Sequence, residues 1–108
     1  MKNETQAEKN SYAISVEELR SQLNRGEDIF LLDVRTPEEY MQDNLGGVLI
    51  PLAELPYRLS ELDPTKPMVI HCHVDGRSQQ AMHLLLQNNF SSVKFLRGGI
   101  VAWRKGDL

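Results

Sequence analysis

Residues 71–78 have the sequence His-Cys-His-Val-Asp-Gly-Arg-Ser, and the segments on either side of them are those of a strand and a helix. The apolar run at residues 68–70 predicts a short buried strand. The segment 79–89 that follows predicts a helix with one apolar face. Cys72 is the one cysteine of the chain, and it therefore lies where a strand ends and a loop leads into a helix.

This position favours a reactive thiol at Cys72. Successive backbone N–H groups in such a loop bind anions, and the dipole of the following helix adds to their effect. A helix N-terminus or a nearby cation stabilises the thiolate, which is the nucleophilic form of cysteine. A buried structural cysteine would be the simpler interpretation without context, but the sequence Gly76-Arg77-Ser78 at the opening of the helix favours chemistry.

The loop resembles the active-site loop of rhodanese-family sulfurtransferases, in which a cysteine after a strand is followed at this spacing by Arg-Ser. Residues 32–40 (LDVRTPEEY) and 96–103 (LRGGIVAW) resemble the first and last signatures of the same family. The three matches occur in the family's order and span residues 29–105. The resemblance implies a rhodanese-like three-layer α/β domain over residues 11–108, with a mainly parallel five-stranded sheet flanked by helices.

The pattern of the chain agrees with this class of fold. Apolar runs predict strands at residues 12–14, 29–32, 48–50, 68–70 and 93–96. Helices are expected after Ser15 and after Thr36, each opened by a capping box, and then at 51–62, at 79–89 and after Gly98. Strands that alternate with helices predict a parallel sheet, whose sites lie beyond the carboxyl ends of the strands.

Composition excludes several other classes. The chain has 108 residues, 41% of them apolar, and a formal net charge of −3, which suits one compact domain without a nucleic-acid surface. No apolar stretch approaches the roughly 20 residues of a membrane span. Residues 1–10 are polar and predict a disordered tail instead of a secretory signal. One cysteine cannot form an internal disulfide, which fits a cytoplasmic protein.

The resemblance implies a sulfurtransferase in which Cys72 attacks the sulfane sulfur of a donor, holds it as a persulfide and passes it to an acceptor. Loop backbone N–H groups would stabilise the anion, much as an oxyanion hole does. Arg77 is expected to hold the loop through hydrogen bonds to carbonyls or to a carboxylate, with Asp33 as one candidate. Ser78 would cap the helix or donate to the sulfur. The expected substrate and persulfide loop comprises His73, Val74, Asp75, Gly76, Arg77 and Ser78, with no metal and no cofactor.

Side chains on neighbouring segments receive supporting roles. Asp33 is interpreted as a group that hydrogen-bonds the next turn, because a carboxylate near a thiolate would destabilise it. Arg35 is expected either to pair with a carboxylate or to face the loop. His71 is interpreted as a buried strand-end residue bonded to a carbonyl instead of a general base. Glu38 and Glu39 suit a helix start and are given no catalytic role.

The chain departs from the family pattern in two places. Residues 44–47, Asn-Leu-Gly-Gly, stand where many members have His-Ile-Pro-Gly, which predicts a looser turn. Many members also have a basic residue directly after the cysteine and a glycine at the position of Asp75. Here the basic residue is His73, which is only partly charged at neutral pH. A carboxylate of Asp75 inside the loop would repel a dianion such as thiosulfate.

Two alternatives remain open, a cysteine phosphatase or arsenate reductase and a non-catalytic interaction domain. His71-Cys72 followed by an arginine resembles the His-Cys-x5-Arg loop of protein phosphatases, but four residues separate Cys72 from Arg77 here. In the wider family a loop one residue longer, by about 3.3–3.6 Å of extended chain, goes with phosphate. The expected partners are a small sulfur donor and an external thiol, cyanide or partner-protein cysteine as acceptor. The identity of the donor and the oligomeric state stay open.

Overall fold

The computed structural model describes residues 12–106, and the tail predicted at residues 1–10 lies outside them. Strands and helices alternate along the chain, as the sequence predicts. The strands are β1 (Ala13–Ile14), β2 (Phe30–Asp33), β3 (Val48–Leu49), β4 (Met68–His71) and β5 (Val93–Leu96), and the α-helices are α2 (Val16–Asn24), α3 (Pro37–Gln42), α4 (Gly76–Gln87) and α5 (Gly99–Lys105).

The strands form one five-stranded sheet in the order β1-β5-β4-β2-β3. All four pairings between neighbouring strands are parallel. Asp33 at the end of β2 pairs in register with His71 at the end of β4. The segments that follow these two strands therefore begin side by side, at the carboxyl ends of the strands. The predicted α/β class and parallel sheet are confirmed.

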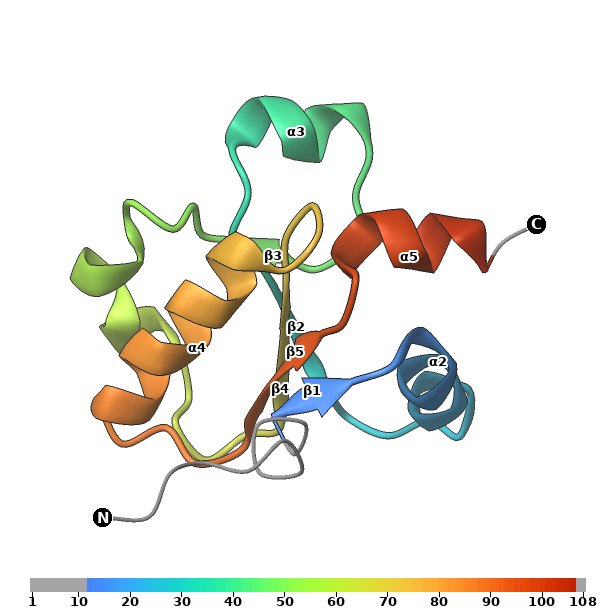
Figure 1. Cartoon of the computed structure of the whole chain (residues 1–108). Helices are drawn as coiled ribbons and strands as arrows, with labels where there is room; N and C mark the ends of the chain where they lie inside the picture. The colour runs from blue at the N-terminus through green and yellow to red at the C-terminus, as the bar shows by residue number, and fades with distance from the viewer. Residues whose placement is uncertain (1–11, 107–108) are drawn as a thin grey trace, which may run out of the picture.

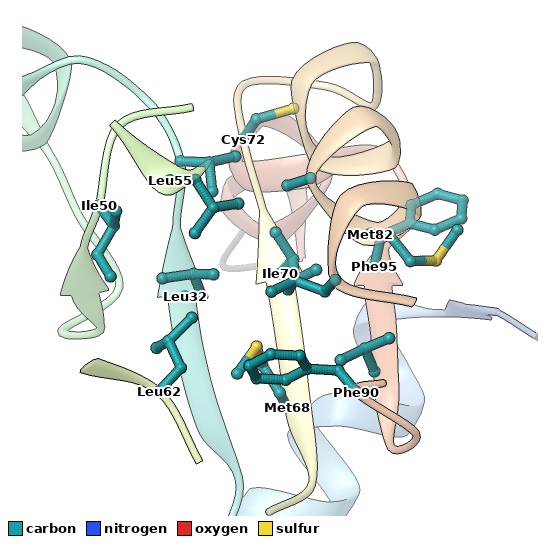
Figure 2. Close-up of a cluster of buried hydrophobic side chains, with 14 residues drawn as sticks. Leu32, Ile50, Leu55, Leu62, Met68, Ile70, Cys72, Met82, Phe90 and Phe95 are labelled. Atoms are coloured by element: carbon teal, nitrogen blue, oxygen red, sulfur yellow. The ribbon is translucent and has the colours of Figure 1, made fainter. Parts of the chain in front are cut away.

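Helices cover both faces of the sheet, which gives three layers (Figure 1). Helix α4 and two 3-10 turns, η1 (Leu55–Tyr57) and η2 (Leu59–Glu61), lie on one face, and α2 and α5 lie on the other. On the α4 side, Ala81, Met82 and Leu85 pack against side chains of the central strands. Figure 2 shows this cluster, with Cys72 at its upper end and its sulfur pointing towards the start of α4.

The second face has a smaller core of its own. Val16 and Leu19 of α2 pack with Val69 of β4 and Leu96 of β5, and Trp103 of α5 lies against this cluster. Successive residues of a strand point to opposite faces, so Val69 and its neighbour Ile70 belong to different clusters. A strand buried on both faces reads as a continuous apolar run, which explains the run before Cys72.

Two predicted helices differ from the structure. The helix predicted over residues 51–62 is wrong, because the segment forms the two short turns η1 and η2. Pro56 lies in the middle of the segment, where its ring lacks an N–H donor and obstructs an α-helix. Helix α4 begins at Gly76, three residues before the predicted start at Gln79. Arg77 and Ser78 therefore lie in the first turn of the helix and not in the loop that precedes it.

Local signals around α3 are confirmed. Thr36 and Glu39 form a reciprocal capping box, and Pro37 occupies the first helical turn. In the turn that follows, the Asn44 side chain accepts a hydrogen bond from the Gly46 N–H at 2.8 Å. A Cβ atom at Gly47 would lie 2.7 Å from the Leu31 carbonyl oxygen, so this glycine lets the turn pack directly on β2.

Within residues 12–106, no helix is long and apolar enough to cross a membrane. In the same part of the chain, no three His, Cys, Asp or Glu side chains come together in the way that a metal ion would require.

Candidate active site

Cys72 lies directly after the central strand β4, at the carboxyl ends of the parallel strands. The residue is 2% exposed, whereas His73 and Val74 after it are exposed. The loop thus has a buried sulfur at its base and exposed side chains at its tip. This is the position that the order of sequence elements predicts for Cys72.

Ser78 contacts the sulfur with both of its polar groups. Its backbone N–H donates to Sγ of Cys72 over 3.4 Å, and its hydroxyl oxygen lies 3.5 Å from Sγ. The same hydroxyl donates to the carbonyl of Asp75 over 2.9 Å. Ser78 is itself buried, so its contact with the sulfur is shielded from solvent. Ser78 therefore donates to the sulfur through its backbone N–H, whereas the N-cap of α4 is Asp75 and not Ser78.

The first turn of α5 holds the other side of the loop. The backbone N–H of Ile100 donates to the Cys72 carbonyl over 3.0 Å, and that of Val101 donates to the His73 carbonyl over 3.2 Å. A Cβ atom at Gly99 would lie 2.5–2.6 Å from the carbonyl oxygens of Cys72, His73 and Val74. Gly99 also has φ of +58°, a left-handed conformation that favours glycine. Only a residue without a side chain lets α5 approach the loop this closely.

The orientation of these carbonyls determines where the loop N–H groups point. In a trans peptide unit the C=O and the N–H point in opposite directions. The carbonyls of Cys72, His73 and Val74 face α5. The N–H groups of residues 73–75, which belong to the same peptide units, therefore point away from α5 and into the loop. Such a set of convergent N–H groups binds an anion.

Asp75 was predicted to place its carboxylate inside the loop, but the side chain points towards the start of α5 instead. Its carboxylate oxygen Oδ1 accepts a hydrogen bond of 2.8 Å from the backbone N–H of Gly98, at the start of α5. Asp75 occupies the N-cap position of α4, but its side chain makes no capping bond there. The carboxylate instead ties the loop to α5 through this hydrogen bond. It lies on the same side of the loop as the carbonyls that face α5.

Arg77 bonds a carboxylate, but that carboxylate belongs to Glu39 and not to the candidate Asp33. The two guanidinium nitrogens Nη1 and Nη2 donate to the two carboxylate oxygens over 2.6 and 2.9 Å. The Arg77–Glu39 pair links the first turn of α4 to α3 and leaves about a third of each side chain exposed. Hydrogen bonds from Arg77 lower the pKa of Glu39 to about 2. The pKa of Arg77 is raised, chiefly by its hydrogen bond to Glu39 and further by the charge of Cys72.

Asp33 and Arg35 form a second pair, which is buried. Nε and Nη2 of Arg35 donate to the Asp33 carboxylate over 2.8–3.2 Å, and the Arg35 backbone N–H donates to Oδ1 over 3.0 Å. The side chain of Arg35 is 4% exposed and that of Asp33 is 0% exposed. Arg35 also donates to the carbonyl of Asp43 over 2.7 Å. The pair therefore fixes the segment around α3, and Asp33 bonds the following turn as expected.

His71 is buried at the end of β4, but its predicted bond to a carbonyl is absent. Neither ring nitrogen has a hydrogen-bond partner among the described residues, and Nε2 lies 3.7 Å from the Asp33 carboxylate. Burial lowers the pKa of His71, and the nearby charge of Asp33 opposes that effect. A neutral imidazole beside the buried pair is the state that this environment favours.

Three residues complete the site without having been assigned to it from the sequence. The capping box already gives Glu39 a local role. The sequence therefore offers no reason to expect its contact with Arg77, which lies 38 positions later. Gly98 and Gly99 belong to the last family signature and precede the predicted final helix, and no role at the site was predicted for them. A pair of glycines at the end of a strand can also indicate a close approach between backbones, which is the role that the structure gives to Gly99.

Comparisons with known proteins match nearly the whole described chain. The family model of the rhodanese-like domain matches residues 15–106. A protein of Allochromatium vinosum named sulfurtransferase is 38% identical over 96 residues, which cover 88% of this chain and 90% of that protein. A solved structure from Lactobacillus plantarum has a TM-score of 0.81 at 25% identity, covering 94% of this chain and 89% of the other. The thiosulfate sulfurtransferase of Pseudomonas aeruginosa has a TM-score of 0.80 at 30% identity, covering 94% of this chain and 20% of that one.

Proposed function

Because this chain belongs to the family of rhodanese-like domains, we propose that it is a sulfurtransferase that carries sulfane sulfur as a persulfide on Cys72. Relatives named sulfurtransferase support an activity of this type. Cys72 is the nucleophile, and residues 73–78 form the loop that holds the transferred sulfur. Asp33 and Arg35 support the site by fixing the segment around α3, which carries the partner of Arg77.

The observation that carries this proposal is the orientation of the loop around the sulfur. The carbonyls of residues 72–74 face α5, which leaves the N–H groups of residues 73–75 directed into the loop. The Ser78 N–H donates to Sγ from the opposite end of the loop. N–H groups fixed in this way stabilise a thiolate and then a persulfide anion without reorganisation.

The reaction has two displacements at sulfur. First, the thiolate of Cys72 attacks the sulfane sulfur of the donor, a new S–S bond forms, and the donor's bond to that sulfur breaks with its electron pair. Second, an acceptor nucleophile attacks the outer sulfur of the persulfide, and the electron pair of the S–S bond returns to Cys72. The chain contains one cysteine, so the acceptor is an external thiol, cyanide or a cysteine of a partner protein.

Burial of Cys72 and exposure of the loop tip favour an acceptor that approaches across His73 and Val74. Val74 is 47% exposed, and His73 is also exposed. The inner sulfur is covered by the loop and by Ser78, so attack at the outer sulfur is favoured over attack at the inner one. That selectivity is what a sulfur carrier needs, because attack at the inner sulfur would release the sulfur and leave a mixed disulfide.

The pairing of Arg77 with Glu39 argues against phosphate chemistry. An arginine that binds phosphate presents its guanidinium to the oxyanion inside the loop. Here both terminal nitrogens of Arg77 donate to Glu39 on α3. The loop also has four residues between Cys72 and Arg77. Both features favour a single bound sulfur over a tetrahedral oxyanion.

The test measures two reactions with the same preparation. Transfer of sulfur from a sulfane donor to cyanide is followed as thiocyanate, and phosphate release is followed with p-nitrophenyl phosphate. We expect thiocyanate formation that is lost in Cys72→Ser, and negligible phosphate release. Phosphate release that depends on Cys72, without thiocyanate formation, would replace the proposal with a phosphatase. Absence of both reactions would favour the interaction domain.

A further inference from the structure

The electrostatic environment of the sulfur depends on a carboxylate that lies outside the loop. Arg77 directly precedes Ser78, whose N–H contacts Sγ, and the negative charge of Cys72 contributes to the raised pKa of Arg77. Its guanidinium is therefore the cation that would attract an anionic donor to this end of the loop. In the structure that cation faces Glu39, which accepts from both of its terminal nitrogens.

The Asp33–Arg35 pair and Asp75 add no net positive charge near the loop. Arg35 is buried against Asp33, so the two charges of this pair cancel at the distance of the sulfur. Asp75 contributes a negative charge, which is held by the Gly98 N–H. With Arg77 neutralised by Glu39, an incoming donor encounters the thiolate and Asp75 without a net positive charge from these two arginines.

We infer that Glu39 is a specificity-determining residue for the sulfur donor, because its pairing with Arg77 makes the loop favour monoanionic donors, such as thiosulfonates and persulfides, over the dianion thiosulfate. This inference rests on the proposed function and names its substrate class. A site without net positive charge penalises a dianion about twice as strongly as a monoanion, since the Coulomb energy is proportional to the ligand's charge.

The substitution Glu39→Gln separates this role from the role of Glu39 in the fold. Oε1 of Glu39 accepts from the backbone N–H and the hydroxyl of Thr36, both over 3.1 Å. A glutamine at the same position of a capping box keeps that acceptor. Its amide nitrogen replaces Oε2, so the bond to Nη2 of Arg77 is lost and the guanidinium charge is no longer compensated. Helix α3 should therefore remain intact while the loop gains one positive charge.

Two donors of similar size and different charge provide the measurement. Thiosulfate is a dianion and methanethiosulfonate is a monoanion, and the sulfane sulfur of each goes to the thiolate while sulfite or methanesulfinate leaves. The rate of persulfide formation on Cys72 is followed by intact mass with each donor at low ionic strength. The readout is the ratio of the two rates, which is insensitive to a general loss of activity.

The wild-type protein should load faster from methanethiosulfonate than from thiosulfate. In Glu39→Gln the rate ratio should shift towards thiosulfate by about tenfold, which corresponds to about 1.4 kcal/mol. The shift should shrink at high salt, because the uncompensated charge is partly exposed. The matched control is Glu38→Gln, which removes the same charge from the exposed neighbouring residue and should leave the ratio unchanged.

The outcomes distinguish the inference from the function beneath it. Equal ratios in wild type and Glu39→Gln, with loading in both, would overturn the specificity role and leave the sulfurtransferase intact. An equal shift in Glu38→Gln would also overturn it, since net charge alone would then be the cause. Failure of every variant to load from either donor would overturn both.

Discussion

The two arginine–carboxylate pairs near Cys72 differ in nearly every physical respect. Asp33 and Arg35 are two residues apart, almost completely buried, and joined by several hydrogen bonds within one turn. Arg77 and Glu39 are 38 residues apart and about a third exposed, and their pair joins two helices. The first pair fixes the segment around α3. The second is positioned to set the charge at the loop.

The difference in burial predicts that the two pairs contribute to different properties of the protein. A buried pair is costly to break because its surviving partner stays in a medium of low polarity. A half-exposed pair stabilises the fold only weakly, so it can be changed while the protein stays folded. Stability measurements should therefore respond mainly to Asp33–Arg35, and measurements of donor preference mainly to Arg77–Glu39.

The largest expected effect comes from breaking the buried pair. Asp33→Asn leaves the Arg35 guanidinium buried without a counter-charge and should lower the free energy of unfolding by about 3–5 kcal/mol. Urea denaturation followed by circular dichroism measures this change. The double variant Asp33→Asn/Arg35→Met should recover part of the loss, because no uncompensated charge remains. A loss below 1 kcal/mol would show that the pair is not structural.

The third carboxylate of the site sharpens the comparison, because its partner is a backbone N–H. Asp75→Gly leaves the part-buried Gly98 N–H without its acceptor and should cost about 1–3 kcal/mol. It should also slow persulfide formation, because the loop loses its tie to α5. Asp75→Asn keeps an acceptor oxygen for the Gly98 N–H and removes the negative charge, so it should load at least as fast as the wild type. Faster loading in Asp75→Gly than in Asp75→Asn would show that the tie does not hold the loop.

Acid should act first through His71, whose ring lies beside the buried pair. The pKa of His71 is lowered by burial, so between its folded-state pKa and about 6.5 the unfolded chain binds more protons. Stability should therefore fall as the pH drops below about 6.5, by up to about 1.4 kcal/mol per pH unit. Asp33 raises this pKa and Arg35 lowers it. Urea denaturation of wild type and His71→Phe at pH 7.5, 6.0 and 5.0 measures this loss of stability. A dependence on pH that is the same in both proteins would exclude His71 as its origin.

The exposed pair should respond at a much lower pH. The pKa of Glu39 is lowered from 4.5 to about 2 by the hydrogen bonds from Arg77, so its contribution is present above about pH 4.5 and is lost as the pH falls towards 2.

The smallest expected effect is the change in stability on breaking the exposed pair. Glu39→Gln should lower the free energy of unfolding by less than about 1 kcal/mol, because the pair is a third exposed and the capping acceptor remains. The same urea experiment measures it, with Glu38→Gln as the control. A loss as large as that of Asp33→Asn would remove the distinction between the two pairs.

Local patterns in the sequence predicted what depends on local structure. The capping box at Thr36, the strand before Cys72 and the parallel sheet all follow from periodicity and from residues within one turn of each other. The bond from Asp33 to the next turn could be predicted for the same reason. Position at the end of a central strand placed Cys72 at the functional edge of the sheet.

Contacts between distant segments could not be obtained in this way. No local signal pairs Glu39 with Arg77, and the direction of the Asp75 side chain depends on where α5 begins. His71 was expected to find a carbonyl, but the backbone groups around it are used in the sheet and in the turns. Leucines recur at helical spacing in residues 51–62, but Pro56 prevents the predicted helix from forming there.

The central claim is that Cys72 carries the transferred sulfur, and intact mass tests it most directly. The protein is loaded with methanethiosulfonate, the donor is removed, and the mass is followed over hours with and without a small thiol. A gain of one sulfur atom is predicted that persists without thiol, disappears with it, and does not occur in Cys72→Ser. No gain in the wild type, or an equal gain in Cys72→Ser, would contradict the claim.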